Sequence, residues 1–482
     1  MDKKKIGEII EARGARYAEA ADEIWGYAET AFRERRSMAA QIRLLEEEGF
    51  RVANNVGGVE TAFCGEWGEG HPVIAFLGEF DALAGLSQKA GLDRREAEVP
   101  GGNGHGCGHN LLGVASIAAA AALKKVMQEQ GLKGTVRYYG CPGEEGGSGK
   151  AFMVREGAFA DVDAAVTWHP SNCTFTAGTS SLANAQIYYR FRGVSAHAAA
   201  APHLGRSALD AVELMNVGVQ FLREHVIQEA RMHYAITDAG GVSPNVVQPY
   251  AEVLYLLRAP KSGQVREIVE RVDRIAQGAA LMTDTTVEKD FVKSCANIVN
   301  NETMERCLQK NLEFFGAPDF DAADAEFARK IFETTPEPGR FEDLEKRVRG
   351  AGEAGRQALE EAKKDPLPRR ILPYVPSGIP MGGSTDVGDV SWQTPTAQIY
   401  MGTWANSTPG HSWQVVTAGK SPMAHKGMLQ AGKVMAAAGY DLMTDSELLK
   451  KAQNELKERL RGETYVPIPK GVTPRGLSGA KS

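Results

Sequence analysis

The sequence lacks the segments that carry a protein out of the cytoplasm or into a membrane. Residues 1–6, MDKKKI, lead into a charged amphipathic stretch without an apolar signal core, and we expect no membrane span. There is also no CxxC pair and no closely spaced set of cysteines of the kind that staples small secreted domains. We therefore predict a cytoplasmic protein whose cysteines are mostly buried thiols.

Positive charge is not in excess either. The formal net charge is −6, and the 55 Lys and Arg residues are spread along the whole chain, whereas phosphate binding needs a concentrated basic surface. This argues against a nucleic-acid partner and favours a small molecule. Hydrophobic residues make up 43% and charged residues 24% of the chain, close to the averages of globular proteins. A length of 482 residues predicts at least two domains.

Apolar runs alternate with helical patterns in the first part of the chain. The helical spacing within residues 6–49 predicts two helices, broken near Gly26. Strands alternating with an alanine-rich helix then indicate an α/β domain with a mixed, largely parallel sheet, whose ligand crevice lies at the carboxyl ends of the strands. The expected strands are residues 72–77, 135–139 and 164–167, and the expected helix is 110–128.

Residues 185–295 have the pattern of a second unit, a small α/β sandwich inserted into the first domain. Its expected strands are 185–192, 246–257 and 286–298, and its expected helices are 204–221 and 265–282. The insertion divides the first domain into residues 1–184 and 296–482. Within the second part, the charged, proline-rich stretch 335–370 is predicted to be a solvated surface helix and 462–482 a loose terminus.

The densest chemical signal is GHGCGHN at residues 104–110, where the alanine-rich helix begins. A cysteine thiolate and a neutral imidazole are good ligands for borderline metals, and glycines let the backbone come close to an ion. Cys107 and His109 are therefore candidate metal ligands. The alternative is a glycine-rich loop that binds an anion at a helix N-terminus, with incidental histidines.

A second cluster, CPGEEGGSG at residues 141–149, sets Glu144 beside Glu145 in a glycine-rich turn. Neighbouring carboxylates repel each other unless a cation or a shared proton relieves them. With a metal present, one can coordinate while the other acts as a general base on water. The alternative is a solvated acidic turn. His169, which follows the next predicted strand, is expected at the same edge of the sheet, although a lone histidine there is more often a satisfied polar residue than a ligand.

Polar residues of the inserted unit form a third set. His197 and His203 lie in VSAHAAAAPHLGR at residues 194–206, where a tightly packed turn competes equally with a functional role. Asn245 and Arg258 bracket a predicted strand. A buried arginine is costly unless it meets an anion, and its fork fits a carboxylate; the alternative is a surface ion pair.

In their order along the chain, these segments resemble the M20 family of metallopeptidases and amidohydrolases. The resemblance covers nearly the whole chain and includes GEFDALAGL at residues 78–86, residues 104–112 and 139–150, STDVGDVSW at 384–392 and AHKGM at 424–428. It implies a catalytic domain that holds two divalent metal ions, Mn²⁺ or Zn²⁺, and a smaller lid domain that forms a homodimer.

The resemblance also implies roles for single residues. The implied metal ligands are Cys107, His109, Glu145, His169 and His411. Glu144 is the implied general base, and Asp81 an acid near the metals that fixes a ligand's orientation. His197 is implied to bind the oxyanion, often in the partner subunit's site, while Asn245 and Arg258 receive the substrate's carboxylate.

Within that family, the branch resembled most hydrolyses p-aminobenzoyl-glutamate to p-aminobenzoate and glutamate. We therefore expect a metal-dependent amidohydrolase that acts on a small molecule with a free carboxylate. Indole-acetyl-aspartate, other N-acyl amino acids and dipeptides are alternative substrates. A non-catalytic member of a hetero-oligomer is a second class of function, which the intact base and ligand set disfavour. A purely structural metal protein is a third, and it predicts a closed site of four ligands.

Overall fold

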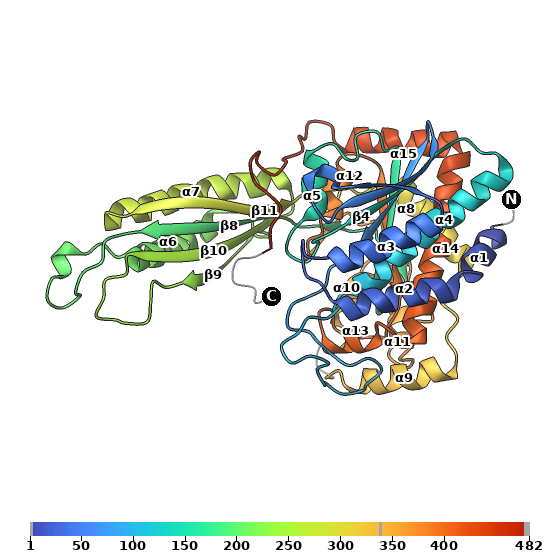
Figure 1. The fold of residues 1–482 in the computed structure, drawn as a ribbon, viewed down its shortest axis with the longest axis horizontal. Helices are drawn as coiled ribbons and strands as arrows, with labels where there is room; N and C mark the ends of the chain where they lie inside the picture. The colour runs from blue at the N-terminus through green and yellow to red at the C-terminus, as the bar shows by residue number, and fades with distance from the viewer. Residues whose placement is uncertain (1–2, 337–339, 477–482) are drawn as a thin grey trace.

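The computed structural model describes residues 3–336 and 340–476. A large α/β body carries an elongated α/β unit that projects from one side (Figure 1). The chain enters the sheet of the projecting unit at Ala183 and leaves it at Cys295, so residues on both sides of this insertion build the body. The predicted α/β class with two such units is confirmed.

The body is organised by a seven-stranded sheet of order β1-β2-β4-β3-β5-β13-β6. The four central strands β4, β3, β5 and β13 are parallel, while the strands at both edges pair antiparallel. The strands are β1 Arg51–Asn54, β2 Phe63–Glu69, β3 Val73–Glu79, β4 Gly134–Cys141, β5 Ala164–Ser171, β6 Phe175–Thr176 and β13 Thr396–Gly402. A second, two-stranded sheet pairs β7 Ser180–Ser181 with β12 Pro380–Met381.

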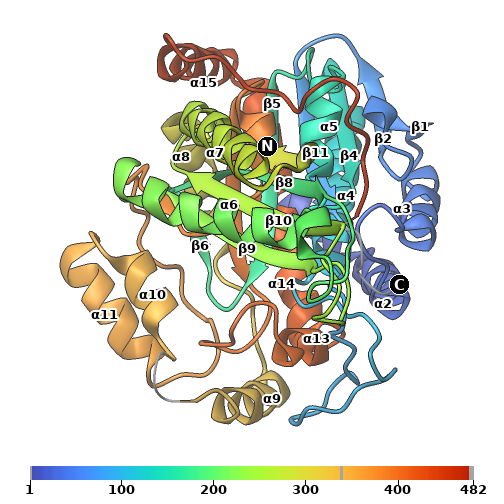
Figure 2. The same cartoon turned by 90° about the vertical axis from the view of Figure 1, so that its left-hand side faces the viewer.

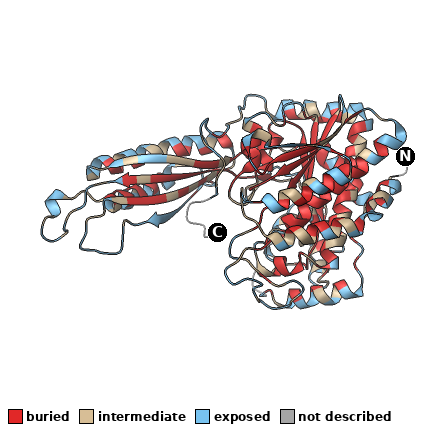
Figure 3. Ribbon diagram, viewed as in Figure 1, coloured by how far each residue is buried: buried red, intermediate tan, exposed pale blue. Residues whose placement is uncertain are grey.

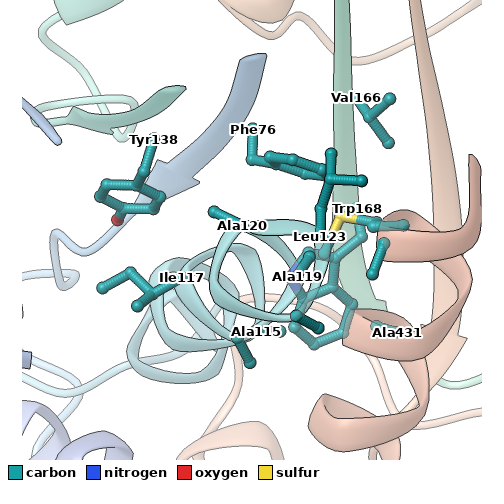
Figure 4. Packing of buried hydrophobic residues seen from close by; sticks show 14 of the residues in the cluster. Phe76, Ala115, Ile117, Ala119, Ala120, Leu123, Tyr138, Val166, Trp168 and Ala431 are labelled. Atoms are coloured by element: carbon teal, nitrogen blue, oxygen red, sulfur yellow. The ribbon is translucent and has the colours of Figure 1, made fainter. Parts of the chain in front are cut away.

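Helices cover both faces of this sheet because its central strands are apolar on both sides. On β3, Ile74 and Phe76 point into the larger core while Val73, Ala75 and Leu77 point into the opposite one. The larger core packs against α4 and α14, where alanines let the helices approach closely; Figure 4 shows Phe76, Val166 and Trp168 around the Ala-rich α4. Burial is concentrated in these central layers (Figure 3).

The helices of the body follow the sequence pattern with two differences. Three helices, not two, precede β1, because the chain breaks between α1 and α2 as well as after Tyr27. The stretch 335–370 contains two short helices rather than one, α10 and α11. The helices are α1 Lys4–Glu11, α2 Gly14–Tyr27, α3 Arg35–Glu47, α4 His109–Gln130, α5 Gly149–Arg155, α8 Glu302–Phe315, α9 Ala322–Glu333, α10 Glu342–Val348, α11 Gly352–Ala362, α12 Val387–Ser391, α13 Trp413–Ala418, α14 Pro422–Thr444 and α15 Ser446–Arg459, with the 3₁₀ turn η1 Val56–Gly58.

The projecting unit, called the lid below, is a four-stranded antiparallel sheet of order β11-β8-β10-β9 with α6 and α7 packed against it. Its edge strand β9 was not located from the sequence, and it is exposed along most of its length. The elements are β8 Ala183–Arg192, α6 Ala208–Leu222, β9 Arg231–Asp238, β10 Tyr250–Ala259, α7 Ser262–Thr283 and β11 Thr286–Cys295, with the 3₁₀ turns η2 Pro202–Leu204 and η3 Arg223–His225. Figure 2 views the lid end-on, with α6 and α7 in front of the body.

Two expectations need correction. The C-terminal segment is not loose up to residue 476, because Tyr465 donates a hydrogen bond to Asp389, Ile468 is buried and the backbone carbonyls of Pro469 and Val472 accept from Arg155; residues 477–482 lie outside the described part. Within the described residues, α4 is long and apolar enough to span a membrane by length and composition, contrary to the expectation, but 89% of its most apolar stretch is buried inside the protein.

Candidate metal centre

The predicted polar clusters meet at one edge of the large sheet. β3 ends at Glu79, two residues before Asp81, and β4 ends three residues before Glu144. α4 begins at His109, because Gly108 takes a left-handed conformation (φ 73°) that turns the chain into the helix. The sequence placed His169 after its strand, whereas it lies inside β5, two residues before the end.

Three groups of side chains have ligand atoms close enough together to hold a metal ion. In each group the candidate atoms lie within 4.8 Å of one another. The groups are Cys107, His109 and His169; Cys107, Glu145 and His411; and Glu79, His109 and Glu144. Because Cys107 belongs to two of these groups, its thiol lies between two neighbouring candidate positions. All five predicted ligands and Glu144 are therefore brought together, and Glu79 joins them.

His109 is fixed by acidic side chains on both sides of its ring. Its Nδ1 donates to Asp81 Oδ1 at 3.0 Å, which leaves Nε2 with a lone pair that points toward Glu79 Oε2 at 3.2 Å. The second oxygen of Asp81 accepts from the backbone N–H of Glu145 at 2.8 Å. Asp81 is itself buried, so it orients His109 and the Glu144–Glu145 turn rather than facing the open side of the site.

His169 is held in the form that suits a metal ligand. Its Nδ1 donates to the carbonyl of Pro170 at 2.7 Å, so Nε2 carries the lone pair and lies 3.4 Å from Cys107 Sγ. Burial, with the nearby charge of His109, lowers the pKa of His169 to about 4, which keeps the ring neutral. Burial raises the pKa of the Cys107 thiol, so without a cation the sulfur keeps its proton.

The two adjacent glutamates have opposite electrostatic environments. Burial works against the charged form of both, but a hydrogen bond with His411 and the charge of His109 lower the pKa of Glu145 to about 2. Glu144 has no such partner, and burial together with the charges of Glu79 and Glu145 raises its pKa well above the ordinary value. A carboxyl group that readily holds a proton beside candidate ligands is suited to accepting and returning one. His411 reaches the site from a left-handed residue (φ 53°), with Nε2 at 3.2 Å from Glu145 Oε1.

A buried ion network behind the site was missed from the sequence. Lys150 has no exposed side-chain surface, and its Nζ lies 2.6 Å from Glu79 Oε1 and 2.6 Å from Asp386 Oδ1. Its backbone N–H also donates to Asp386 Oδ2 at 2.9 Å. The network fixes Glu79 beside His109. A lysine just after a glycine-rich turn and an aspartate in STDVGD were visible signals, but nothing in the spacing joined residues 236 positions apart.

The predicted substrate residues of the lid do not come together within one chain. His197 lies on the loop after β8, exposed, where it forms an isolated bridge with Val246, and its Nδ1 accepts from the backbone N–H groups of Ala199 and Ala200. Asn245 is on the adjoining loop before β10, and its carbonyl accepts from Ala198 N at 2.9 Å. Arg258 is near the other end of the ten-residue β10, about 25–30 Å away at roughly 3.3 Å per residue. It is half-buried and donates to Ser384 Oγ of the body at 2.7 Å.

The donor set fits divalent metal ions. Among the described residues, His109 Nε2 and Glu145 Oε1 are buried without a hydrogen-bond partner, and both point into the candidate groups. Unpaired buried polar atoms are costly, and a cation would satisfy both. Imidazole, carboxylate and one thiol are ligands of borderline metals such as zinc and manganese.

A cavity of about 520 Å³ opens beside Cys107 and His169. Its walls come from the loops after β5 and β13 and from the segment that contains α10. The stretch 335–370, predicted to be only a solvated surface, therefore contributes the far wall of the largest hollow that the described residues form next to the metal groups. Residues 337–339 of that stretch lie outside the described part.

The sequence profile of peptidase family M20/M25/M40 matches residues 75–476, which include all the candidate groups. The chain belongs to this family. It is 50% identical to one of the two named subunits of the p-aminobenzoyl-glutamate hydrolase of Escherichia coli, over 98% of each chain. It is also 27% identical to the Xaa-Arg dipeptidase of Mus musculus, over 96% of this chain and 93% of that protein.

Solved structures share the fold of this M20 protein. A dinuclear metal-binding M20 peptidase of Bacillus subtilis superposes with a TM-score of 0.55 at 17% identity, covering 90% of this chain and 99% of that one. The relatives named above are hydrolases of amide or peptide bonds, and the M20 chain described here is a hydrolase of that kind. Its family and its candidate ligand groups both support bound metal ions.

Proposed function

We propose that this M20 hydrolase cleaves the amide bond of N-acyl amino acids that carry a free carboxylate, and that p-aminobenzoyl-glutamate is its substrate. The observation that carries the proposal is the junction of Glu144 with three candidate metal groups at one sheet edge. The 50% identity over 98% of each chain to a p-aminobenzoyl-glutamate hydrolase supports the choice of substrate.

Two divalent ions, Mn²⁺ or Zn²⁺, are proposed to be held by Cys107, His109, Glu145, His169 and His411. When bound, such ions supply Lewis-acid polarisation of a carbonyl and activation of water near neutral pH. The thiol of Cys107 favours zinc, whereas the family resemblance favours manganese. Asp81 and Lys150 support the ligands from behind, Asp81 through His109 and Lys150 through Glu79.

In the proposed reaction, Glu144 removes a proton from the attacking water and returns it to the leaving nitrogen. The raised pKa of Glu144 suits the second half of that task, because a carboxyl group that holds its proton can act as an acid. Arg258 is proposed to receive the carboxylate of the amino-acid part. Its side chain is half-buried at the junction of lid and body, where a carboxylate would compensate its charge.

His197 and Asn245 are proposed to act in the site of a second copy of the chain. Both lie on loops at the end of the lid sheet remote from Arg258, too far to meet the same small molecule as Arg258 of their own chain. The lid offers an apolar surface for a homodimer: Val217 and Phe221 on α6 are 53% and 71% exposed, and Ile236 on the edge strand β9 is 44% exposed.

A hetero-oligomer with a related chain is the alternative assembly. The Escherichia coli hydrolase is named with two different subunits, and this chain is similar to both of them. It is 50% identical to one over 98% of each chain, and 28% identical to the other over 49% of this chain and 57% of that protein.

Further proposals follow from the same assignment. The lid domain is taken as residues 185–295, between two parts of the catalytic domain at 1–184 and 296–482, and the protein as cytoplasmic. A dipeptidase is the second candidate function, since a relative at 27% identity is named an Xaa-Arg dipeptidase. A role without catalysis is disfavoured because Glu144 and the ligand groups are intact.

The assignment of Glu144 is tested by Glu144→Gln in the full chain. The variant is expected to retain its metal content and to hydrolyse p-aminobenzoyl-glutamate at least ~10³-fold more slowly, because no group in the site replaces the proton carrier. Released p-aminobenzoate and bound metal are measured on the same samples. Turnover equal to that of the unsubstituted protein would remove Glu144 from the reaction.

A further inference from the structure

The cavity beside the candidate metal groups has an aromatic floor that the sheet register creates. Tyr400 on β13 is paired in register with His169 on β5 and with Phe175 on β6, so the three rings form a row across neighbouring strands. The centroids of His169 and Tyr400 are 5.5 Å apart, and Tyr400 stacks on Phe175 at 4.6 Å with an interplanar angle of 5°. The row leads from a candidate ligand toward α10.

Arg347 of α10 lies over the far end of this row. Its guanidinium carbon is 4.7 Å from the centroid of Phe175 and 5.2 Å from that of Tyr400. Leu344 and Val348 anchor α10 by packing in a small core with Phe175, and Arg347, one turn after Leu344, is directed toward the rings by that anchorage. Stacking fixes the plane of a guanidinium and leaves its N–H edges available to a planar anion.

The described wall of the cavity carries an excess of positive charge. Arg340, Lys346 and Arg347 line it together with a single carboxylate, Glu342, which faces Lys346 at 3.6 Å. Arg340 is oriented by the carbonyl of Thr335, which accepts from its Nε at 3.0 Å, and by the ring of Phe332. Two oriented guanidinium groups thus face a hollow that begins at Cys107 and His169.

We propose that this cavity is a subsite for a second carboxylate of the substrate, the side-chain carboxylate of an acidic amino acid, and that Arg347 and Arg340 bind it. The proposal rests on the proposed function, in which Arg258 receives the α-carboxylate. It makes α10, together with the chain at Arg340, the part of the molecule that selects glutamate over neutral amino acids. The aromatic floor supplies the surface against which the aliphatic part of that side chain lies.

The test compares two ligands that differ only in this carboxylate, p-aminobenzoyl-glutamate and p-aminobenzoyl-glutamine. Their binding to the full chain is measured by calorimetry after chelation, so that neither ligand is consumed and the result does not depend on hydrolysis. The unsubstituted protein is expected to bind the glutamate ligand at least ~10-fold more tightly, the effect of a charged hydrogen-bonded pair. Arg347→Met is expected to abolish that preference and to leave binding of the glutamine ligand within about 2-fold.

The matched control is Arg356→Met on α11, an exposed arginine that pairs with Glu353 and does not line the cavity. It is expected to keep the full preference. Arg347→Lys is expected to keep only part of it, because an ammonium retains the charge without the stacked fork. The proposal is overturned if the unsubstituted protein has no preference, or if Arg347→Met weakens both ligands equally or neither. If the preference is present but no N-acyl amino acid is hydrolysed with either metal, the subsite stands and the proposed function fails.

Discussion

Replacing Lys150 by methionine should destabilise the protein far more than the same change at a lysine with equally close partners. The Lys150 ammonium is fully buried at 2.6 Å from Glu79 and 2.6 Å from Asp386. Methionine fills most of the volume but leaves two buried carboxylates without their cation. Removing one partner of a buried ion pair costs about 3–5 kcal/mol, and we expect the upper part of that range because two acids lose their partner.

Lys426 provides the comparison, since its Nζ lies 2.7 Å from Asp321 and 2.6 Å from Asp324 but its side chain is 32% exposed. Water can solvate the charges left by Lys426→Met, so the loss should be about 1 kcal/mol or less.

Both variants can be compared by urea unfolding of the metal-free chain followed by tryptophan fluorescence. All six tryptophans lie within residues 25–168 and 392–413, outside the lid, so the signal reports the part of the molecule that contains Lys150. Equal losses for the two variants, or a loss below about 1 kcal/mol for Lys150→Met, would refute the reasoning that burial makes this network critical.

Three further outcomes are expected. Arg258→Met should raise KM for N-acyl amino acids about 10–100-fold while changing KM for the corresponding carboxamides little, in steady-state assays on both series; an equal rise would remove its carboxylate role. The affinity for Zn²⁺ should increase with pH through neutrality, because burial raises the pKa of Cys107 and its thiol must lose a proton on binding; Cys107→Ser should remove about one tenfold step per pH unit from that dependence in a competition titration. His71 pairs with Asp163, which raises the pKa of the imidazole above its unfolded value, so the stabilisation is present below pH ~6.5 and is lost as pH rises through the raised pKa. Because His71 is 67% exposed, His71→Gln should cost under ~1 kcal/mol in unfolding at pH 5 and nothing at pH 9, and a larger loss at pH 9 would contradict this.

Local sequence was sufficient where neighbouring residues decide the structure. The apolar run before Glu79 and the alanine-rich stretch after His109 have periods that only a buried strand and a buried helix satisfy, and both elements were found close to the predicted bounds. The carboxyl ends of parallel strands share one sheet edge, so the meeting of the polar clusters around Cys107 could be predicted from their position after each strand.

Contacts between distant segments could not be predicted in this way. Lys150 meets Asp386 only because α5 and α12 pack on the same face of the sheet, and no local pattern records that pairing. The charged residues near 340–347 have the composition of a solvated helix, yet the register of Tyr400 between His169 and Phe175 creates the floor on which Arg347 rests. The same limit applies to the lid, where strand length separates Arg258 from Asn245.

The most direct test of the account is hydrolysis of p-aminobenzoyl-glutamate by the full chain before chelation, after chelation, and during stepwise return of Mn²⁺ or Zn²⁺. Release of p-aminobenzoate should stop when metal is removed and should recover as about two ions per chain are bound, with bound metal counted on the same samples. Hydrolysis that persists in the metal-free protein would contradict the account, as would failure of every metal-loaded sample to cleave this substrate.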